Sequence, residues 1–223
     1  GSTLVRPDLE GVEHLFDIDN YAGAIRLDEH LRSLAPVETP PARTIVIVGG
    51  GFTGIELATE LRSRLSQIWG HPAAAAAHVI LVEAAREIGP ALGEGPRRAI
   101  QDALTAARVE VRLNTTLKSA AADSVMLSNG DRIATATIVL TTGMRASSLG
   151  SNLSGAEHDA FGRLKVDRML RVRGVPNVFA GGDIAEALAD DTHLALMSCQ
   201  HALSMGRAAG RNVARDLLGL PLE

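Results

Sequence analysis

Residues Thr44 to Leu57 read TIVIVGGGFTGIEL, and this stretch decides the fold of the chain around it. Its first part, Thr44 to Val48, is a run of β-branched residues of the kind found in buried strands. Three glycines follow with the spacing G-x-G-x-x-G, which allows a tight turn, close approach of a pyrophosphate, and close packing of helix on strand. The N–H groups of the next helix should face the phosphates. The residues expected to contact a dinucleotide are Gly49, Gly50, Gly51, Phe52, Thr53 and Gly54.

The residues after this stretch continue the alternation of strand and helix. Apolar spacing predicts helices at 53–68 and 94–107, and strands at 78–83, 109–113 and 137–141. An Asn129-Gly130 turn between two short apolar stretches, 125–127 and 132–134, predicts a hairpin. The alanine-rich residues 72–77 could prolong a helix or form a loop or a separate turn. This order predicts an α/β fold with a parallel sheet, helices on both sides of it, a small β-meander and a returning strand that closes the domain near Gly143.

The flanking segments carry weaker patterns. Residues 1–18 are expected to be a loop or linker, and residues 19–34 a helix capped by Asp19 or Asn20, ended by Pro36, Pro40 and Pro41. After a polar loop at 146–163, we expect short strands at 164–173 and 175–180, a glycine turn, and a helix at 198–218.

Composition excludes several classes of protein. The 223 residues are 46% hydrophobic and 22% charged, with a net charge of −4 and no basic cluster interleaved with aromatics, which argues against a nucleic-acid partner. The single cysteine, Cys199, rules out a disulfide within the chain, and the histidines lack metal-ligand spacing. No apolar run reaches the length of a membrane span, and no signal peptide is visible, so we expect a cytoplasmic protein without a transmembrane segment.

Glu83 indicates which dinucleotide the glycine loop binds. A carboxylate at the end of the second strand can accept both ribose hydroxyls and would repel a 2′-phosphate. Glu83 lies 29 residues after Gly54, further than the usual offset of about 20, and the insertion at 70–77 accounts for this. We therefore expect NAD(H) rather than NADP(H), although Arg86 nearby could reverse that preference. The alternative is that Glu83 is only a solvated acid at a strand end.

Other candidate residues have roles that spacing alone does not decide. Glu56 is expected in the first turn of the helix after the loop, where an acid is favourable without any catalytic role. A glycine turn with Asp183, and a helix beginning near Cys199, Gln200 and His201, have many structural explanations.

A resemblance joins these segments. GGGFTGIELA at 49–58, Thr141-Thr142-Gly143, FAGGD at 179–183 and CQHA at 199–202 occur in the order seen in flavoproteins related to glutathione reductase. The chain resembles this pyridine nucleotide-disulfide oxidoreductase superfamily, and the glycine loop is most similar to the type II NADH dehydrogenase-like branch. The family has two Rossmann-like domains, with the NAD domain inserted into the FAD domain.

The resemblance implies a domain plan and a set of roles. Residues 42–145 would be the NAD(H)-binding domain, 1–41 a linker and helix of the FAD domain, and 146–223 its returning half. The first FAD half would precede residue 1 and a further domain would follow residue 223. The glycines would line the pyrophosphate, Glu83 would contact the ribose, and Glu56 would stand near the nicotinamide. Gly143 would sit beside the dinucleotide where the chain leaves the domain. Asp183 would bind FAD, with Gly182 allowing close approach, while Cys199, Gln200 and His201 would lie near the flavin ring.

The implied reaction is hydride transfer from NADH to FAD and then to an acceptor. Quinone-reducing members carry Ala-Gln and a second Gln on the last helix. Here Cys199 replaces the Ala and Leu203 to Met205 offer no second Gln, which argues against a quinone and leaves the acceptor unknown. The alternatives are a nucleotide-sensing module without catalysis, and a ferredoxin- or disulfide-type reductase. Exposed strand edges in 146–223 also lead us to expect self-association.

Overall fold

The computed structural model describes residues 1–35 and 37–223, and these form two compact units. The sheet unit is Arg6–Gly143, and the terminal unit combines Gly1–Val5 with Met144–Glu223. Residues 6–41, expected to belong to the FAD domain, pack instead in the sheet unit. The physical reason is that a short strand within them, at 15–17, pairs with a strand of the parallel sheet, and the helix at 21–33 packs against that strand.

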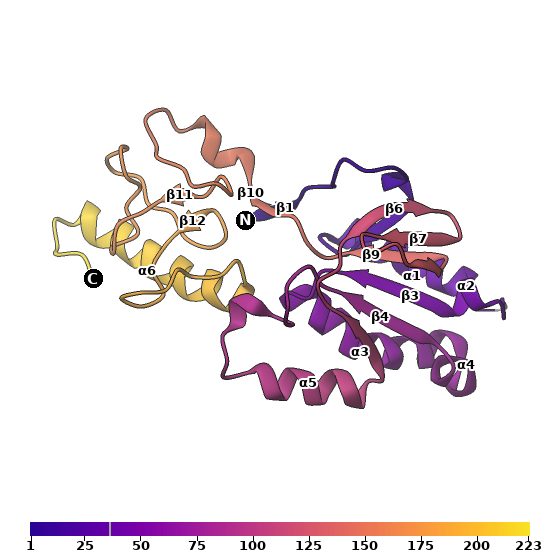
Figure 1. The fold of residues 1–223 in the computed structure, drawn as a ribbon. Coiled ribbons are helices and arrows are strands. Elements are labelled where there is room, and N and C mark those ends of the chain that lie inside the picture. The colour runs from indigo at the N-terminus through magenta and orange to yellow at the C-terminus, as the bar shows by residue number, and fades with distance from the viewer. Residues whose placement is uncertain (36) are drawn as a thin grey trace. The chain divides into compact units, whose positions relative to one another are not determined.

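The sheet unit is built on five parallel strands in the order β2-β9-β3-β4-β5. The strands β9, β3 and β4 can be followed side by side in Figure 1. The strands are β2 (Leu15–Asp17), β3 (Thr44–Val48), β4 (His78–Val82), β5 (Val109–Arg112) and β9 (Thr137–Leu140). All five residues of β3 are buried, as its β-branched composition predicts. Because β3 is the middle strand, the loop that follows it leaves from the centre of the sheet.

Helices cover one face of this sheet. α1 (Tyr21–Ser33), α3 (Phe52–Trp69), α4 (His71–Ala75) and α5 (Arg97–Ala106) contribute to the core on this face, whereas we had expected helices on both sides. The unit also contains α2 (Pro40–Arg43) and two short 3-10 turns, η1 (Val12–His14), which contacts the strand β6 (Leu117–Ala121), and η2 (Pro90–Leu92). Ile45, Ile47 and Val79, which alternate along their strands, share a core with Leu27 of α1 and Leu65 of α3. The predicted α/β fold is confirmed.

A three-stranded antiparallel meander completes the sheet unit. It consists of β6 (Leu117–Ala121), β7 (Ser124–Leu127) and β8 (Arg132–Ala134). The Asn129-Gly130 hairpin joins β7 and β8 as predicted, and Gly130 adopts a φ of 91° that the turn requires. The strand β6 was not expected from the sequence.

The terminal unit has little regular structure apart from one long helix. It contains β1 (Ser2–Leu4) paired with β10 (Met144–Ala146), η3 (Ser148–Asn152), β11 (Leu164–Lys165) paired with β12 (Ala185–Glu186), and α6 (Cys199–Leu217). Its own apolar core includes Leu164, Val172 and Met205. The predicted helix at 198–218 is confirmed, but the strand expected at 175–180 is wrong. That segment contributes only an isolated bridge between Arg171 and Phe179.

Two other boundaries differ from expectation. Pro40 and Pro41 open the short helix α2 instead of separating domains, since proline fits the first turn of a helix. The helix α1 is capped by Asn20, whose side chain accepts from the Gly23 N–H. Pro36, where we expected that helix to end, lies outside the described residues.

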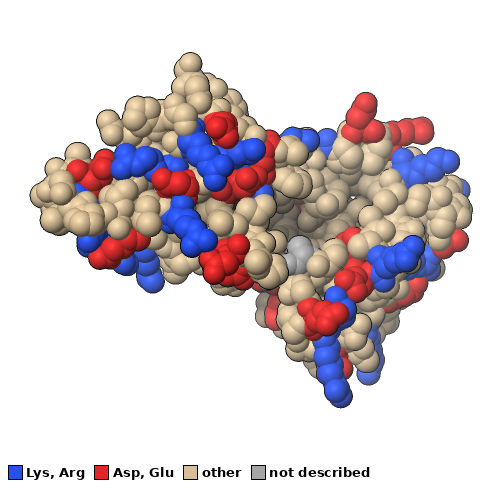
Figure 2. Space-filling view, turned by 60° about the vertical axis from the view of Figure 1, so that its left-hand side comes forward, with Lys and Arg blue, Asp and Glu red and all other residues tan. Residues whose placement is uncertain are grey.

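Charged side chains of both signs are interspersed on the face drawn in Figure 2. Arg168 with Asp191, at 2.8 Å, is an exposed pair of the terminal unit. Such pairs contribute at most about 1 kcal/mol each, so the two apolar cores account for most of the stability. Within the described residues, none of the helices combines the length and the apolar character that crossing a membrane requires.

Candidate functional site

The glycine loop after β3 has three glycines in three different environments. Gly49 has a φ of 117°, which a residue with a side chain rarely adopts. A Cβ on Gly54 would lie 1.8 Å from the Gly49 carbonyl oxygen, so only glycine lets α3 start this close to the strand. A Cβ on Gly51 would meet nothing within 4 Å. The first and third glycines therefore shape the loop, and the second leaves open space beside the backbone.

The loop is fastened by the ends of neighbouring strands. The buried hydroxyl of Thr141, after β9, lies 3.0 Å from both the Val48 and Gly49 carbonyl oxygens. The Gly49 N–H donates to the Val82 carbonyl at 2.8 Å, and the Gly89 N–H donates to the Gly50 carbonyl at 2.9 Å. We had not predicted this role for Thr141, because its pairing with the loop arises only when β9 lies beside β3.

The start of α3 offers free backbone donors. Gly51 is the N-cap and supplies no side chain to cap the helix. The first intrahelical bond runs from the Ile55 N–H to the Gly51 carbonyl at 3.0 Å, so the N–H groups of Phe52, Thr53 and Gly54 precede it. These donors and the positive end of the helix dipole favour an anion at this position.

Glu56 is exposed and lies one residue further along α3 than we expected, just beyond the first turn. The helix begins at Phe52, so Glu56 is its fifth residue, and the first turn contains no acid. Because the helix-dipole effect falls off within the first turn, it does not account for a carboxylate at this position. The structural explanation for Glu56 is thereby weakened.

Glu83 follows β4 directly and points its carboxylate at the loop. Its Oε2 accepts the Gly50 N–H at 2.6 Å, and its Oε1 accepts the Ala85 N–H at 2.8 Å. Each carboxylate oxygen can accept a second hydrogen bond, so Glu83 can hold the loop and still accept from a ligand hydroxyl. Glu83 is thus more than a solvated acid at a strand end.

A cavity of about 260 Å³ opens beside Glu83 and Gly49. Its walls come from five segments of the sheet unit and are mostly apolar. They are formed by Pro7, Leu9, Val48, Gly49, Val82, Glu83, Ala84, Thr115, Thr116, Leu117, Leu140 and Thr142. Pro7, Leu9 and the residues 115–117 carry no sequence signal for this role, because only the topology brings them to the carboxyl ends of β3 and β4. Gly143 has a φ of 89° and is exposed at the end of the unit, next to this wall.

In the terminal unit, Asp183 has one satisfied and one unsatisfied oxygen. Its Oδ2 accepts the Ser2 hydroxyl at 2.7 Å. Its Oδ1 is buried and has no hydrogen-bond partner within residues 1–35 and 37–223. Buried carboxylate oxygens are normally hydrogen-bonded, so this atom calls for a donor that the chain itself does not supply.

The glycine turn before Asp183 packs on the first turns of α6. A Cβ on Gly181 would lie 2.9 Å from the Met205 carbonyl oxygen, and Gly182, with a φ of 82°, lies against Ala202. Ser198 caps the helix by accepting the His201 N–H at 3.3 Å. The structure therefore brings the two terminal-unit motifs, 181–183 and 199–202, together.

The three predicted residues at the start of α6 differ in exposure. Cys199 and Gln200 are exposed, and the Cys199 thiol donates to the Gln200 Oε1 at 3.2 Å. His201 is half-buried, and its Nδ1 lies 2.8 Å from the Ser198 hydroxyl.

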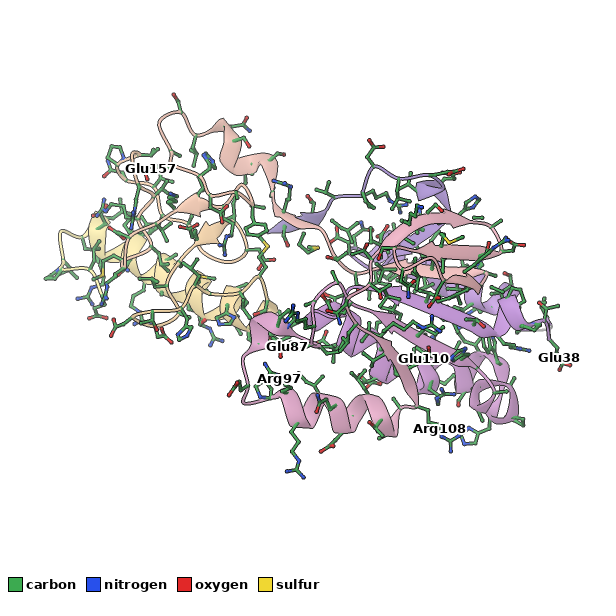
Figure 3. All side chains as sticks on the ribbon, in the orientation of Figure 1. Glu38, Glu87, Arg97, Arg108, Glu110 and Glu157 are labelled. Atoms are coloured by element: carbon green, nitrogen blue, oxygen red, sulfur yellow. The ribbon has the colours of Figure 1, made fainter. Side chains whose placement is uncertain are left out.

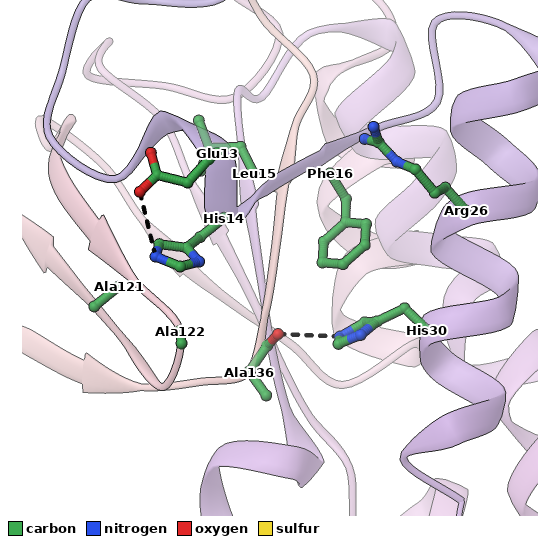
Figure 4. A pocket seen from close by; sticks show the side chains of 9 residues that line it. All are labelled: Glu13, His14, Leu15, Phe16, Arg26, His30, Ala121, Ala122 and Ala136. Atoms are coloured by element: carbon green, nitrogen blue, oxygen red, sulfur yellow. Dashed lines mark hydrogen bonds and ion pairs between the residues drawn. The ribbon is translucent and has the colours of Figure 1, made fainter.

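A second cavity of the sheet unit, of about 360 Å³, contains none of the predicted residues. Figure 4 shows the Phe16 ring between His30 and Arg26, with His14 and Glu13 on the opposite wall. His30 stacks on Phe16 with ring centroids 4.3 Å apart, and its Nε2 donates to the Ala136 carbonyl at 3.0 Å. Burial lowers the pKa of His30 below its ordinary value of 6.5.

No group of three or more His, Cys, Asp or Glu side chains suited to a metal ion occurs in the described part of the chain. The polar groups at the glycine loop are backbone N–H donors and one carboxylate acceptor. The donors suit a phosphate, and the acceptor suits a hydroxylated sugar.

Relatives with curated descriptions match over much of the chain. An NADH dehydrogenase-like protein of Mycobacterium tuberculosis is 45% identical over all of this chain and 56% of its own length. The type II NADH:quinone oxidoreductase of Haemophilus influenzae is 31% identical over 80% of this chain and 41% of its own length. The chain thus spans about half the length of these relatives.

A solved structure shows the same fold at lower identity. The NAD-dependent persulfide reductase from A. fulgidus superposes with a TM-score of 0.75 and 22% identity, over 96% of this chain and 38% of that one. The sequence pattern of one family, pyridine nucleotide-disulphide oxidoreductase, matches residues 1–206, and the chain therefore belongs to this family.

Proposed function

We propose that the chain is the nicotinamide-binding part, and one portion of the flavin-binding part, of an FAD-dependent NADH:acceptor oxidoreductase. Membership of the family implies NAD(H) and FAD as cofactors. The observation that carries the proposal is the glycine loop, where Gly51 leaves open space beside the uncapped start of α3. A pyrophosphate is the group whose charge and size suit that position.

In this proposal the sheet unit holds NAD(H). Gly49, Gly51 and Gly54 border the pyrophosphate, and the carboxylate of Glu83 accepts from the adenosine ribose. The same carboxylate disfavours a 2′-phosphate, so NADH is the preferred cofactor. The exposed Glu56 and Gly143 would border the nicotinamide half.

The terminal unit would contribute to the FAD site. The orphaned Oδ1 of Asp183 fits a hydroxyl donor such as those of the ribityl chain. Gly182 permits close approach, and Cys199, Gln200 and His201 at the start of α6 would border the flavin ring. When bound, the flavin would accept the hydride of NADH and pass the electrons on.

For the electron acceptor we propose a quinone, because the Haemophilus influenzae relative is named as a quinone oxidoreductase. The missing Ala and second Gln on α6 argue the other way, so the acceptor needs a direct test. The test is NADH oxidation by the full-length protein with a short-chain quinone, compared with a disulfide and with oxidised ferredoxin. Faster turnover with the disulfide or ferredoxin would contradict the quinone. Absence of turnover with all three, together with intact NADH binding, would favour a nucleotide-sensing module.

The nucleotide site itself is tested by Gly51→Ala. Gly51 has a φ of −80° and open space around its Cβ position, so the fold should accept alanine. The added methyl group would occupy the space proposed for the pyrophosphate. We expect NADH binding at least about tenfold weaker, equivalent to about 1.4 kcal/mol, measured by calorimetric titration.

The control is Gly95→Ala, which also adds a methyl group in open space, outside the glycine loop. Both variants should unfold at the temperature of the parent chain. Equal NADH affinity of Gly51→Ala and Gly95→Ala would place the pyrophosphate elsewhere.

A further inference from the structure

A cavity of about 380 Å³ lies between α5 and the edge strand β5. It shares no lining residue with the cavity beside Glu83, and it contains none of the residues assigned above to NAD(H) or FAD. Its volume falls in the range of small-molecule sites, about 300–1,000 Å³. We therefore asked which ligand its walls would suit.

The floor of this cavity is apolar. Five aliphatic side chains from the loop after β4, from α5 and from β5 form it, namely Ile88, Leu104, Val109, Val111 and Leu113. Val111 keeps 36% of its surface exposed although it lies in a strand of the sheet. Apolar surface that α5 leaves uncovered in this way is suited to an apolar portion of a ligand.

One rim of the cavity carries an incompletely satisfied guanidinium. The Nη2 of Arg97 donates to the Glu87 carboxylate at 2.8 Å, and Figure 3 shows these two side chains next to each other at the start of α5. The Nε of Arg97 is buried and has no hydrogen-bond partner among the residues that the structure describes. Buried N–H donors are almost always paired, so this donor lacks an acceptor.

The charges around Arg97 favour an anion as that acceptor. Arg86 lines the same cavity and forms no ion pair within the described ranges, so the two arginines face a single lining carboxylate, that of Glu87. The exposed Glu94, outside the lining, lies 3.9 Å from the Arg97 Nη1 and leaves the Nε unpaired. Arg97 and Arg98 also open α5, whose first turn contains no acid and whose N-cap, Pro96, offers no side-chain bond. Cations are unfavourable at the positive end of a helix, and a bound anion would relieve this.

We propose that this cavity binds a small amphipathic carboxylate. The carboxylate would accept from the Arg97 Nε and pair with Arg86, while an aliphatic tail covers the floor formed by Val109, Val111 and Leu113. An inorganic anion would leave the floor in contact with water, and a neutral hydrocarbon would leave the Arg97 Nε without an acceptor. The site is separate from the proposed dinucleotide site, so the two proposals can fail independently.

The test uses decanoate as the probe, titrated calorimetrically into the 223-residue chain. Decanol, which keeps the tail, and acetate, which keeps the carboxylate, should each bind at least about tenfold more weakly. Arg97→Gln should weaken decanoate binding at least about tenfold, since it removes a charged donor. The matched control is Arg98→Gln, the same change at the next, exposed residue of α5, which should alter binding less than about twofold.

A second variant fills the floor without touching the charges. Val111→Trp should occupy the cavity from an exposed strand position where an aromatic residue is well tolerated, and should abolish decanoate binding. Unchanged far-UV circular dichroism and an unchanged unfolding temperature confirm that each variant is folded. NADH at saturation should leave decanoate binding unchanged.

Three results would overturn the proposal. If decanol binds as tightly as decanoate, the Arg97 guanidinium does not recognise the carboxylate. Equal losses in Arg97→Gln and Arg98→Gln would reduce the effect to net charge. Displacement of decanoate by NADH would place the probe in the dinucleotide site.

Discussion

Gly54 sets the distance between the glycine loop and α3. A Cβ built on Gly54 would lie 1.8 Å from the Gly49 carbonyl oxygen and 2.8 Å from the Thr141 hydroxyl, so glycine leaves room for both atoms. Both neighbours are held in place by hydrogen bonds. The Gly49 N–H donates to the Val82 carbonyl, and the Thr141 hydroxyl donates to the Gly49 carbonyl. A side chain here could be accommodated only by moving the helix off the strand.

We therefore expect Gly54→Ala to destabilise the chain by about 3 kcal/mol, measured by urea unfolding. Gly210→Ala is the matched control, because Gly210 also lies within a helix but its Cβ position is open. Removing a glycine from a helix with free space should stabilise it by up to about 1 kcal/mol. Equal effects of the two changes would show that the contact with Gly49 does not exist.

His30 is a residue whose protonation is coupled to folding. Its Nε2 must carry the proton that bonds the Ala136 carbonyl, since a carbonyl only accepts. Desolvation lowers its pKa below 6.5, partly opposed by that same bond. The other titratable or charged groups that line its cavity are Glu13, His14 and Arg26.

The sign of the pH effect follows from this direction. Because the folded pKa is the lower one, the unfolded chain binds protons first on acidification, and stability present above pH 6.5 is lost as the pH falls through the folded value. His30→Gln keeps an amide donor for Ala136 and should flatten the loss of unfolding free energy below pH 6.5. The control is His71→Gln at an exposed position, which should leave the slope unchanged. A steep slope retained in His30→Gln would assign the effect to other groups.

At the scale of elements, Arg62 ties α3 to its neighbours. Its guanidinium donates to the carbonyls of Ala74 in α4, of Ala77 before β4, and of Ala107 after α5, at 2.6, 3.2 and 3.0 Å. These carbonyls lie at the end of a helix or just before a strand, where intrahelical partners run out. The Ala74 carbonyl also accepts the Ala77 N–H at 3.2 Å. One side chain thus donates hydrogen bonds to carbonyl groups of three separate segments.

Arg62→Ala should cost about 2–3 kcal/mol in urea unfolding, since it leaves buried carbonyl groups unsatisfied. Arg64→Ala, two residues along the same helix, removes an exposed ion pair with Asp28 and should cost at most about 1 kcal/mol. If the two substitutions cost the same, the carbonyl bonds of Arg62 are not stabilising.

The elements predictable from the sequence were the long ones with a clear period. β3, β4, α3 and α6 each carry enough apolar positions to identify them, and β3 also leads into the glycine motif. By contrast β2, with three residues, exists because Leu15 pairs with Ile138 more than 100 residues away. Such pairing leaves no local pattern. The expected strand at 175–180 failed because an apolar run alone does not supply a partner strand.

The candidate site divides in the same way. The glycines and Glu83 were predictable because their positions follow from one local motif and one strand end. Thr141, Pro7 and Leu117 were not, since they reach the loop through the order of strands in the sheet. Asp183 was predicted as a site residue only through resemblance. Its buried, unpaired Oδ1 is the physical observation that supports this prediction.

At the scale of the whole protein, the terminal unit should decide whether flavin is retained. In full-length protein, Asp183→Asn should lower the flavin absorbance per protein, because an amide is a weaker acceptor than the buried carboxylate oxygen. Asp191→Asn removes the same charge from an exposed residue of the same unit and should retain flavin as the parent does. Full flavin content in Asp183→Asn would remove this residue from the proposed FAD site.

The pairing of β1 with β10 has a consequence for how such a protein can evolve. Leu4 lies opposite Met144 in an antiparallel ribbon, so the chain departs for the sheet unit and returns from it at neighbouring points. Residues 6–143 can therefore be treated as an exchangeable cassette, since their removal would leave two strands that a tight turn could join into a hairpin. Recombination at this ribbon would replace the proposed nucleotide site in one step and leave the residues proposed for the flavin untouched.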